Sequence, residues 1–181
     1  MAYKFLESKI SVSTDNAILF AKNIKLQDLD NPELRLESCG NVASKLAESD
    51  RIRNELIFFQ RDFPKKKVGA VLDGRDIGSV IFPDAKIKLF VTADLEVRAQ
   101  RRQVDYKKMG QEYSLRDLTE KLKERDKRDK TREVSPLICM PDAIVFDNSE
   151  ISFERLNKEI IEIVEKKYKS LNLDVNNKKK S

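Results

Sequence analysis

Residues 68–83 read VGAVLDGRDIGSVIFP, and this stretch decides the fold. Its opening run of mostly β-forming apolar residues, 68–72, predicts a strand buried on both faces, as in a parallel sheet. The charged side chains of Asp73, Arg75 and Asp76 follow at once, at the end of a strand where open α/β sheets bind ligands. An arginine fork suits a phosphate, whereas the carboxylates suit a base, a ribose or a metal ion. The alternative is a polar turn in which the arginine and an aspartate pair with each other.

The composition favours an anionic partner. With 181 residues the chain is long enough for one domain with a sizeable core. Charged residues make up 37% and the formal net charge is +5, which favours phosphates, nucleotides or nucleic acid. Because the sequence contains no histidine, its chemistry must rest on carboxylates, arginines and lysines, and these suit phosphoryl transfer. Cys39 and Cys139 lack the spacing of a zinc site or a disulfide framework.

The sequence lacks the features of a membrane or secreted protein. It contains no apolar run long enough to span a bilayer, and its N-terminus has no basic region followed by an apolar signal core. We therefore expect a cytoplasmic protein without a membrane partner.

Periodic apolar residues and capping residues predict the other elements. Strands are expected over 87–91 and 143–146. Helices are expected after Thr14-Asp15, near Gly40, from an N-cap at Asp50 to residue 63, from 94 to 108, from a cap at Ser114, and over 152–168. Together these elements indicate an α/β fold with a parallel sheet.

A charged segment follows the predicted cap at Ser114. Residues 120–132 read EKLKERDKRDKTR, with seven basic residues against four acids and Leu122 as the one apolar side chain. We therefore expect a solvated, mobile helix. Arg125, Asp129 and Arg132 are spaced i, i+4, i+7, which places them on one helix face, where they could reach a phosphate and a ribose together. The alternative is an exposed helix laced with salt bridges.

The segments DGRDIGSVIFPDAKIKLFVTA, RAQRR and KERDKRDKTREVSPL resemble the second half of bacterial cytidylate kinase, a nucleoside monophosphate kinase of the P-loop phosphotransferase type. The resemblance covers about residues 2–168. The family begins with a strand and a GxxxxGK[ST] loop, and this sequence contains no GK[ST] triplet. We therefore expect the C-terminal portion of such a kinase: a three-layer P-loop-kinase-like fold that lacks its first, central strand and the Walker A loop.

The resemblance implies a single truncated domain over residues 1–181. Its parts are expected to be acceptor-binding helices over 1–64, core strands and a helix over 65–110, a lid over 111–137, a core strand and the C-terminal helix over 138–169, and a frayed tail over 170–181.

The implied activity is transfer of the terminal phosphoryl group of magnesium-bound ATP to CMP or dCMP, which gives CDP or dCDP. In the family pattern Ser44, Arg53 and Asp76 recognise cytosine. Arg75 and Arg132 hold the acceptor phosphate, and Arg125 with Asp129 meets the sugar hydroxyls. Arg125 and Arg132 are also the expected catalytic residues, because they would neutralise charge on the transferred group. Without the resemblance, Ser44 and Arg53 would pass as ordinary surface residues.

The resemblance implies a weaker set of donor-side residues. Arg98, Arg101 and Arg102, with Asn148 and Ser149, would approach the donor nucleotide, although a solvated basic face is the alternative for each arginine. Asp73 would support magnesium, through water.

Three functions follow from these observations. The first is a cytidylate kinase whose activity needs the missing part, which a separate N-terminal fragment would supply. The second is a non-catalytic CMP-binding remnant. The third is a basic nucleic-acid-binding module, which the scarcity of interleaved aromatic residues disfavours. The resemblance also implies a monomer.

Overall fold

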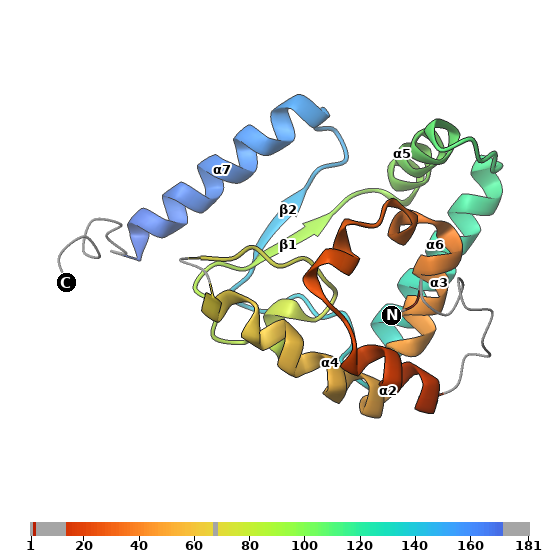
Figure 1. Ribbon diagram of the computed structural model, residues 1–181. Coiled ribbons are helices and arrows are strands. Elements are labelled where there is room, and N and C mark those ends of the chain that lie inside the picture. The colour runs from red at the N-terminus through yellow and green to blue at the C-terminus, as the bar shows by residue number, and fades with distance from the viewer. Residues whose placement is uncertain (1, 3–13, 67–68, 172–181) are drawn as a thin grey trace.

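The structure is a computed structural model that describes residues 2, 14–66 and 69–171 (Figure 1). Its helices are α2 (Thr14–Lys22), α3 (Glu37–Leu46), α4 (Asp50–Asp62), α5 (Leu95–Lys108), α6 (Leu115–Thr131) and α7 (Phe153–Ser170). Short 3₁₀ turns at Leu26–Asp30, Pro32–Arg35 and Pro64–Lys66, and a π-helical turn at Ile77–Ile81, connect them. Among the described helices, none combines the length and apolar character needed to cross a bilayer.

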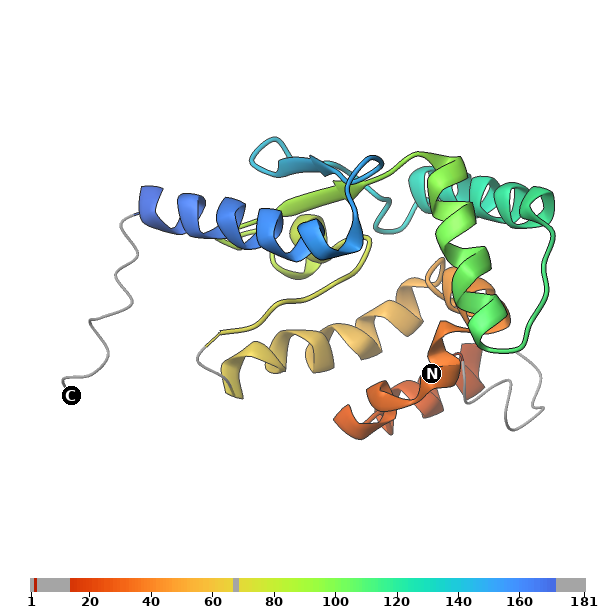
Figure 2. The same cartoon turned by 90° about the horizontal axis from the view of Figure 1, so that it is seen from above.

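A small parallel sheet confirms two of the predicted strands and the α/β class. β1 (Leu89–Thr92) pairs in parallel with β2 (Ile144–Asp147), with Leu89 opposite Ile144. In Figure 1 the two strands lie between α7 and α4. Figure 2 shows the α5–α6 pair at the end of the molecule opposite to the C-terminal end of α7.

The strand predicted over 68–72 is not formed by its described part, residues 69–72, and Val68 lies outside the described residues. Val71 is 97% exposed, so this segment is not buried on both faces. β-forming residues hold a strand only where a neighbouring strand supplies the hydrogen bonds and another layer covers the face. In the described part of the chain, the sheet consists of β1 and β2 alone, and neither pairs with residues 69–72.

The N-terminal helices pack around one apolar cluster. α2, α3 and α4 confirm the three helices predicted here, and they bury Ala17, Cys39, Leu46 and Ile52 together. The N-cap of α4 is Ser49, one residue before the predicted Asp50, which begins the helix. This cluster fixes α3 and α4 relative to each other, so the side chains on their opposite faces have fixed positions.

α5 and α6 form a second packed unit. Ala99 and Tyr106 of α5 are buried against Leu118 and Leu122 of α6. The predicted helix cap is confirmed, because the Ser114 hydroxyl accepts a hydrogen bond of 3.0 Å from the backbone N–H of Asp117. Gly110 ends the preceding helix in the left-handed region, at φ +74°.

The expectation of a solvated helix over 120–132 is wrong for the end of α6. Asp129 is 2% exposed and Arg132 is 9% exposed. The apolar stripe does end after Leu122, but the charged side chains that follow are buried against other charged and polar side chains rather than against a core. Polar pairing across helices therefore fixes the end of this segment.

The helix predicted over residues 152–168 is confirmed. α7 extends to Ser170, two residues beyond the predicted helix. Leu156, Ile160 and Val164 on this helix are half-buried. Residues 172–181 of the predicted frayed tail lie outside the described residues.

Candidate functional site

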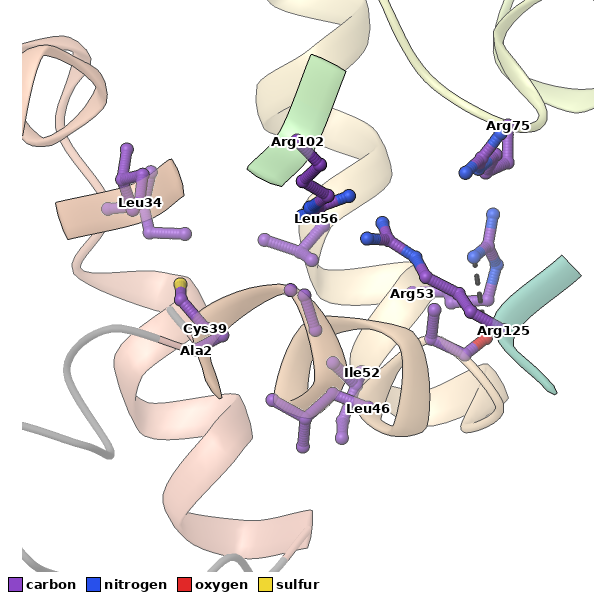
Figure 3. Close-up of a pocket in the computed structure, with 14 residues that line it drawn as sticks. Ala2, Leu34, Cys39, Leu46, Ile52, Arg53, Leu56, Arg75, Arg102 and Arg125 are labelled. Carbon is purple, nitrogen blue, oxygen red and sulfur yellow. Dashed lines mark hydrogen bonds between the residues drawn. The ribbon is translucent and has the colours of Figure 1, made fainter. Parts of the chain in front are cut away.

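A cavity of about 550 Å³ opens between α3, α4, α5, α6 and the loop at Arg75. Apolar side chains line part of its wall, among them Leu34, Cys39, Leu46 and Leu56. Arg53 from α4, Arg75 from the loop, Arg102 from α5 and Arg125 from α6 line the rest. Figure 3 shows these arginine side chains reaching toward the same space from different elements. A cavity with apolar and cationic walls suits an anion whose other part packs against apolar side chains.

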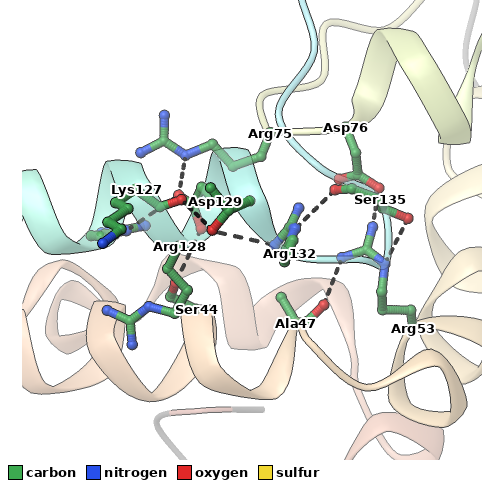
Figure 4. A network of polar contacts seen from close by, with 12 residues as sticks. Ser44, Ala47, Arg53, Arg75, Asp76, Lys127, Arg128, Asp129, Arg132 and Ser135 are labelled. Carbon is green, nitrogen blue, oxygen red and sulfur yellow. Dashed lines mark hydrogen bonds and ion pairs between the residues drawn. The ribbon is translucent and has the colours of Figure 1, made fainter.

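Asp129 is the centre of the polar network beside this cavity (Figure 4). Its Oδ1 accepts a hydrogen bond of 3.0 Å from the Ser44 hydroxyl. Its Oδ2 lies 3.0 Å from Nε of Arg75 and 3.9 Å from Nε of Arg125. Nη1 of Arg132 lies 3.9 Å from Oδ1. One buried carboxylate thus holds three guanidiniums that come from two separate segments.

A second pair forms the other side of the network. Arg53 donates a hydrogen bond from Nη2 to Oδ2 of Asp76, and both side chains are largely buried. Nε of Arg53 donates to the Ser135 hydroxyl at 3.0 Å. Nε of Arg132 donates to the Ser135 carbonyl oxygen at 2.8 Å. Ser135 has a positive φ of 48°, an uncommon conformation outside glycine, and it connects the two arginines.

Several polar atoms of α6 and its C-cap are buried without a hydrogen-bond partner among the described residues. They are Nε of Arg125, Nε of Arg128, Oδ2 of Asp129 and Nη2 of Arg132. Such a buried group costs about 1–3 kcal/mol unless a partner satisfies it. The Asp129–Arg75 ion pair does not meet the geometry of a hydrogen bond, so Oδ2 retains its capacity to accept one.

The buried arginines carry incompletely balanced charge. Burial lowers the pKa of Arg125 below its ordinary value, and repulsion from Arg75 and Arg102 lowers it further. Burial and then repulsion from Arg53 lower the pKa of Arg132. Asp129 opposes both shifts. An anion in the cavity would complete this balance, because it would favour the charged form of each guanidinium.

The structure thus brings together seven residues predicted for the acceptor: Ser44, Arg53, Arg75, Asp76, Arg125, Asp129 and Arg132. Ser44 is buried and Arg53 is half-buried, so neither is an ordinary surface residue. The alternative of a self-paired turn at Arg75-Asp76 is wrong, because Arg75 pairs with Asp129 and Asp76 pairs with Arg53. The alternative of an exposed salt-bridged helix is wrong for Asp129 and Arg132.

The residues predicted for the donor side do not form one cluster. Arg101 donates to the side-chain and carbonyl oxygens of Asn148, at 2.7 Å each. The Ser149 hydroxyl accepts a hydrogen bond of 2.8 Å from the backbone N–H of Asp94. Arg98 pairs with Asp126 at 2.7 Å.

Of Arg98, Arg101 and Arg102, it is Arg102 that lines the cavity together with predicted acceptor residues. Asp73, the predicted metal-supporting residue, is exposed. Within residues 2, 14–66 and 69–171, no group of three or more carboxylate or cysteine side chains could hold a metal ion.

Sequence reasoning missed several residues of the site. Ser135 belongs to a Ser-Pro dipeptide at the end of the expected lid, and no site role was expected for it. Glu37 and Tyr106, which contact Arg102, also had no assigned role. Glu37 precedes Ser44 by seven residues on α3, so helical periodicity placed both on one face, and this spacing was the available signal.

Comparisons with known proteins agree on one family. A family model described as cytidylate kinase matches residues 3–166. The chain is 39% identical over 165 residues to the cytidylate kinase of Cereibacter sphaeroides strain KD131, an alignment that covers 91% of this chain and 80% of that protein. It is 45% identical over 129 residues to the cytidylate kinase of Methylococcus capsulatus, with 71% and 58% of the two chains covered. It is 38% identical over 155 residues to that of Bartonella henselae, with 85% and 72% covered.

Proposed function

Because the chain belongs to the cytidylate kinase family, whose members are nucleoside monophosphate kinases, we propose that its arginine-lined cavity is the acceptor site for CMP or dCMP. The observation that carries this proposal is the set of buried atoms on α6 and its C-cap that form no hydrogen bond within the described residues. Nε of Arg125 and Nη2 of Arg132 are donors, and Oδ2 of Asp129 is an acceptor. A nucleotide supplies what each lacks: phosphate oxygens for the donors and a sugar hydroxyl for the acceptor.

The Arg53–Asp76 pair supports a preference for cytosine. Cytosine carries an exocyclic amine, which donates, next to ring and carbonyl acceptors. A carboxylate beside a guanidinium offers an acceptor and donors in the complementary order. Uracil would present a carbonyl oxygen to the Asp76 carboxylate in place of the amine, and two facing oxygens with no hydrogen to share are costly in a buried site. The Ser44 hydroxyl lies at the neighbouring Asp129 and adds a further polar contact near the base.

The phosphate is assigned to the guanidiniums. Arg75 and Arg132 would bind the acceptor phosphate through paired hydrogen bonds, which the planar guanidinium favours. Nε of Arg125 lies 3.9 Å from Oδ2 of Asp129, the proposed sugar-binding residue, so Arg125 would contact both the sugar and the phosphate. During transfer, Arg125 and Arg132 would neutralise charge on the moving phosphoryl group without further rearrangement, because ion pairs already orient them.

The proposed phosphoryl donor is ATP with Mg²⁺, the donor that a kinase of this family implies. Magnesium in such sites takes one or two carboxylates together with substrate phosphates and water. Asp73 is a single exposed carboxylate two residues before Arg75, so it would act through a water molecule. The metal would supply charge neutralisation between the phosphates. Asn148 and Ser149 follow β2, Arg101 of α5 donates to Asn148, and these residues would approach the donor base.

Calorimetric titration of the whole chain with CMP tests the acceptor assignment, with UMP and AMP as competing ligands. CMP is expected to bind most tightly, and Asp76→Asn is expected to reduce the preference for CMP over UMP. Asp84→Asn is the matched control, because Asp84 is an exposed aspartate eight residues further along the chain. Equal affinity for the three nucleotides, or an unchanged preference in Asp76→Asn, would contradict the proposal.

A further inference from the structure

We propose that Arg102 is a further ligand of the acceptor phosphate, and that Glu37 and Tyr106 are the residues that position it. This inference rests on the proposed acceptor site and deepens it. It moves Arg102 from the donor side, where its place in RAQRR suggested it, to the cavity that Arg75 and Arg125 line.

One nitrogen of Arg102 is used for positioning. Its Nε donates a hydrogen bond of 2.8 Å to the Tyr106 hydroxyl, one turn further along α5. The Tyr106 hydroxyl in turn donates to Oε2 of Glu37 on α3 at 3.0 Å. Oε2 of Glu37 also lies 3.6 Å from Nε of Arg102. Tyr106 is only 2% exposed and belongs to the apolar cluster of α5 and α6, so this anchor cannot move freely.

The other two nitrogens of Arg102 remain for a ligand. Its Nη1 and Nη2 form no hydrogen bond with another residue in the described part of the chain. Figure 3 shows the side chain pointing into the cavity from α5, toward the space that Arg125 enters from α6. A guanidinium that is held through Nε keeps its two terminal nitrogens free for paired contacts with phosphate oxygens.

Gly40 shows how closely Arg102 and Arg125 approach. A Cβ atom at Gly40 would lie 3.0 Å from Nη1 of Arg125 and 3.5 Å from Nη2 of Arg102. Both guanidiniums therefore lie over the same turn of α3. Glu37 is one turn earlier on this helix, and Ser44 is one turn later. A single face of α3 thus positions Arg102 through Glu37, leaves room for Arg125 at Gly40, and holds Asp129 through Ser44.

The local charge balance favours an anion at this place. Arg75, Arg102 and Arg125 lie around the cavity, and the carboxylates that pair with them are Asp129 and Glu37. Three positive charges therefore face two negative charges. The repulsion from Arg102 that lowers the pKa of Arg125 agrees with this excess. A phosphate group between Arg102 and Arg125 would offset the repulsion.

The neighbouring arginines of α5 do not share this geometry. Arg98 pairs with Asp126 at 2.7 Å and donates to the Ala93 carbonyl oxygen at 2.9 Å. Arg101 is occupied by the oxygens of Asn148 and Ile151. Neither lines the cavity.

The test compares CMP with cytidine, which lacks the phosphate, by calorimetric titration of the whole chain. Arg102→Gln is expected to weaken CMP binding about tenfold and to leave cytidine binding unchanged. Arg116→Gln, an exposed arginine of α6, is the matched control and should bind CMP as the unmodified chain does. Unchanged CMP affinity in Arg102→Gln, or equal losses for CMP and cytidine, would overturn the inference. If the unmodified chain does not bind CMP, the proposed function itself is wrong. If the unmodified chain binds CMP but Arg102→Gln binds it equally well, only the inference about Arg102 is wrong.

A double-mutant cycle tests the positioning role of Glu37. Glu37→Ala is expected to weaken CMP binding about fivefold in the unmodified chain and to have no effect in the Arg102→Gln background. A structural role that is independent of Arg102 would give equal losses in both backgrounds, and this result would overturn the assignment of Glu37. A gain in CMP affinity on Glu37→Ala would also overturn it, because the carboxylate would then act through its charge alone.

Discussion

The Ser44 hydroxyl donates a hydrogen bond of 3.0 Å to Asp129, although 85 residues separate the two in the sequence. This contact joins α3 to α6 and is buried. It places Asp129 where Arg75, Arg125 and Arg132 converge, so the charged end of α6 is held against the cavity.

Replacing Asp129 with asparagine should destabilise the chain strongly. The substitution keeps the size of the side chain and removes the negative charge shared by Arg75, Arg125 and Arg132. Breaking a buried ion pair from one side costs about 3–5 kcal/mol, because the partner charges remain buried. Urea unfolding measures the loss. Asp105→Asn is the control, since Asp105 is an exposed aspartate of α5, and an equal loss in both variants would contradict the role of Asp129.

Ser44→Ala should lower the free energy of unfolding by about 1–2.5 kcal/mol. The loss of a hydrogen bond to a charged group, about 1.5–3 kcal/mol, is offset in part by the better helix propensity of alanine, about 0.5 kcal/mol. Ser38→Ala on the exposed side of α3 should show the propensity gain alone. The difference between the two variants in urea unfolding isolates the contact to Asp129. No difference would show that this contact does not contribute to stability.

Gly40→Ala should change stability and ligand binding in opposite directions. Alanine in the interior of α3 raises helix stability by up to about 1 kcal/mol. Its Cβ would lie 3.0 Å from Nη1 of Arg125, so the guanidinium must shift by a few tenths of an ångström from its place in the cavity. We expect a higher melting temperature together with CMP affinity reduced several-fold. Melting curves check the rise in melting temperature, and calorimetry on the same sample checks the fall in CMP affinity. An unchanged CMP affinity would contradict the assigned position of Arg125.

Tyr106 should titrate late at alkaline pH. Burial raises the pKa of its hydroxyl above the ordinary value of 10.0. Between 10.0 and the raised pKa, the folded state holds a proton that the unfolded state has released, so stability is expected to fall as pH rises through this window. Absorbance at 295 nm follows the ionisation, and Tyr106→Phe should remove the late step. If the late ionisation step persists in Tyr106→Phe and disappears in Tyr168→Phe, its assignment to Tyr106 is wrong.

The residues of the proposed acceptor site could be named from the sequence and its family resemblance, but the contacts that bring them together could not. The spacing of Arg125, Asp129 and Arg132 indicated a common helix face, and the DGRD loop indicated a ligand-binding turn. Their burial was missed because the charged stretch around them has no apolar stripe, and partners such as Ser44 and Arg75 come from distant segments. Pairing between distant segments leaves no periodic signal in the sequence.

Parts of the fold could likewise be predicted from the sequence, and other parts could not. Helices with clear caps and periodicity, such as α5 and α6, were predicted to within a residue or two, because local propensity and packing agree there. The strand at 68–72 was predicted wrongly, because an apolar β-forming run forms a strand only where a neighbouring strand supplies hydrogen bonds. No strand pairs with residues 69–72 in the described part of the chain.

A thermal melt of the unmodified chain with and without millimolar CMP tests the central claim most directly, with AMP and inorganic phosphate as controls. A ligand that binds only the folded state stabilises it by about 2.7 kcal/mol at a hundredfold excess over its Kd. A single cooperative transition that CMP raises by several degrees, and that AMP and phosphate raise less, is the result we expect. A transition that does not respond to CMP, or that responds equally to all three, would show that the cavity at Arg53, Arg75 and Arg125 is not a CMP site.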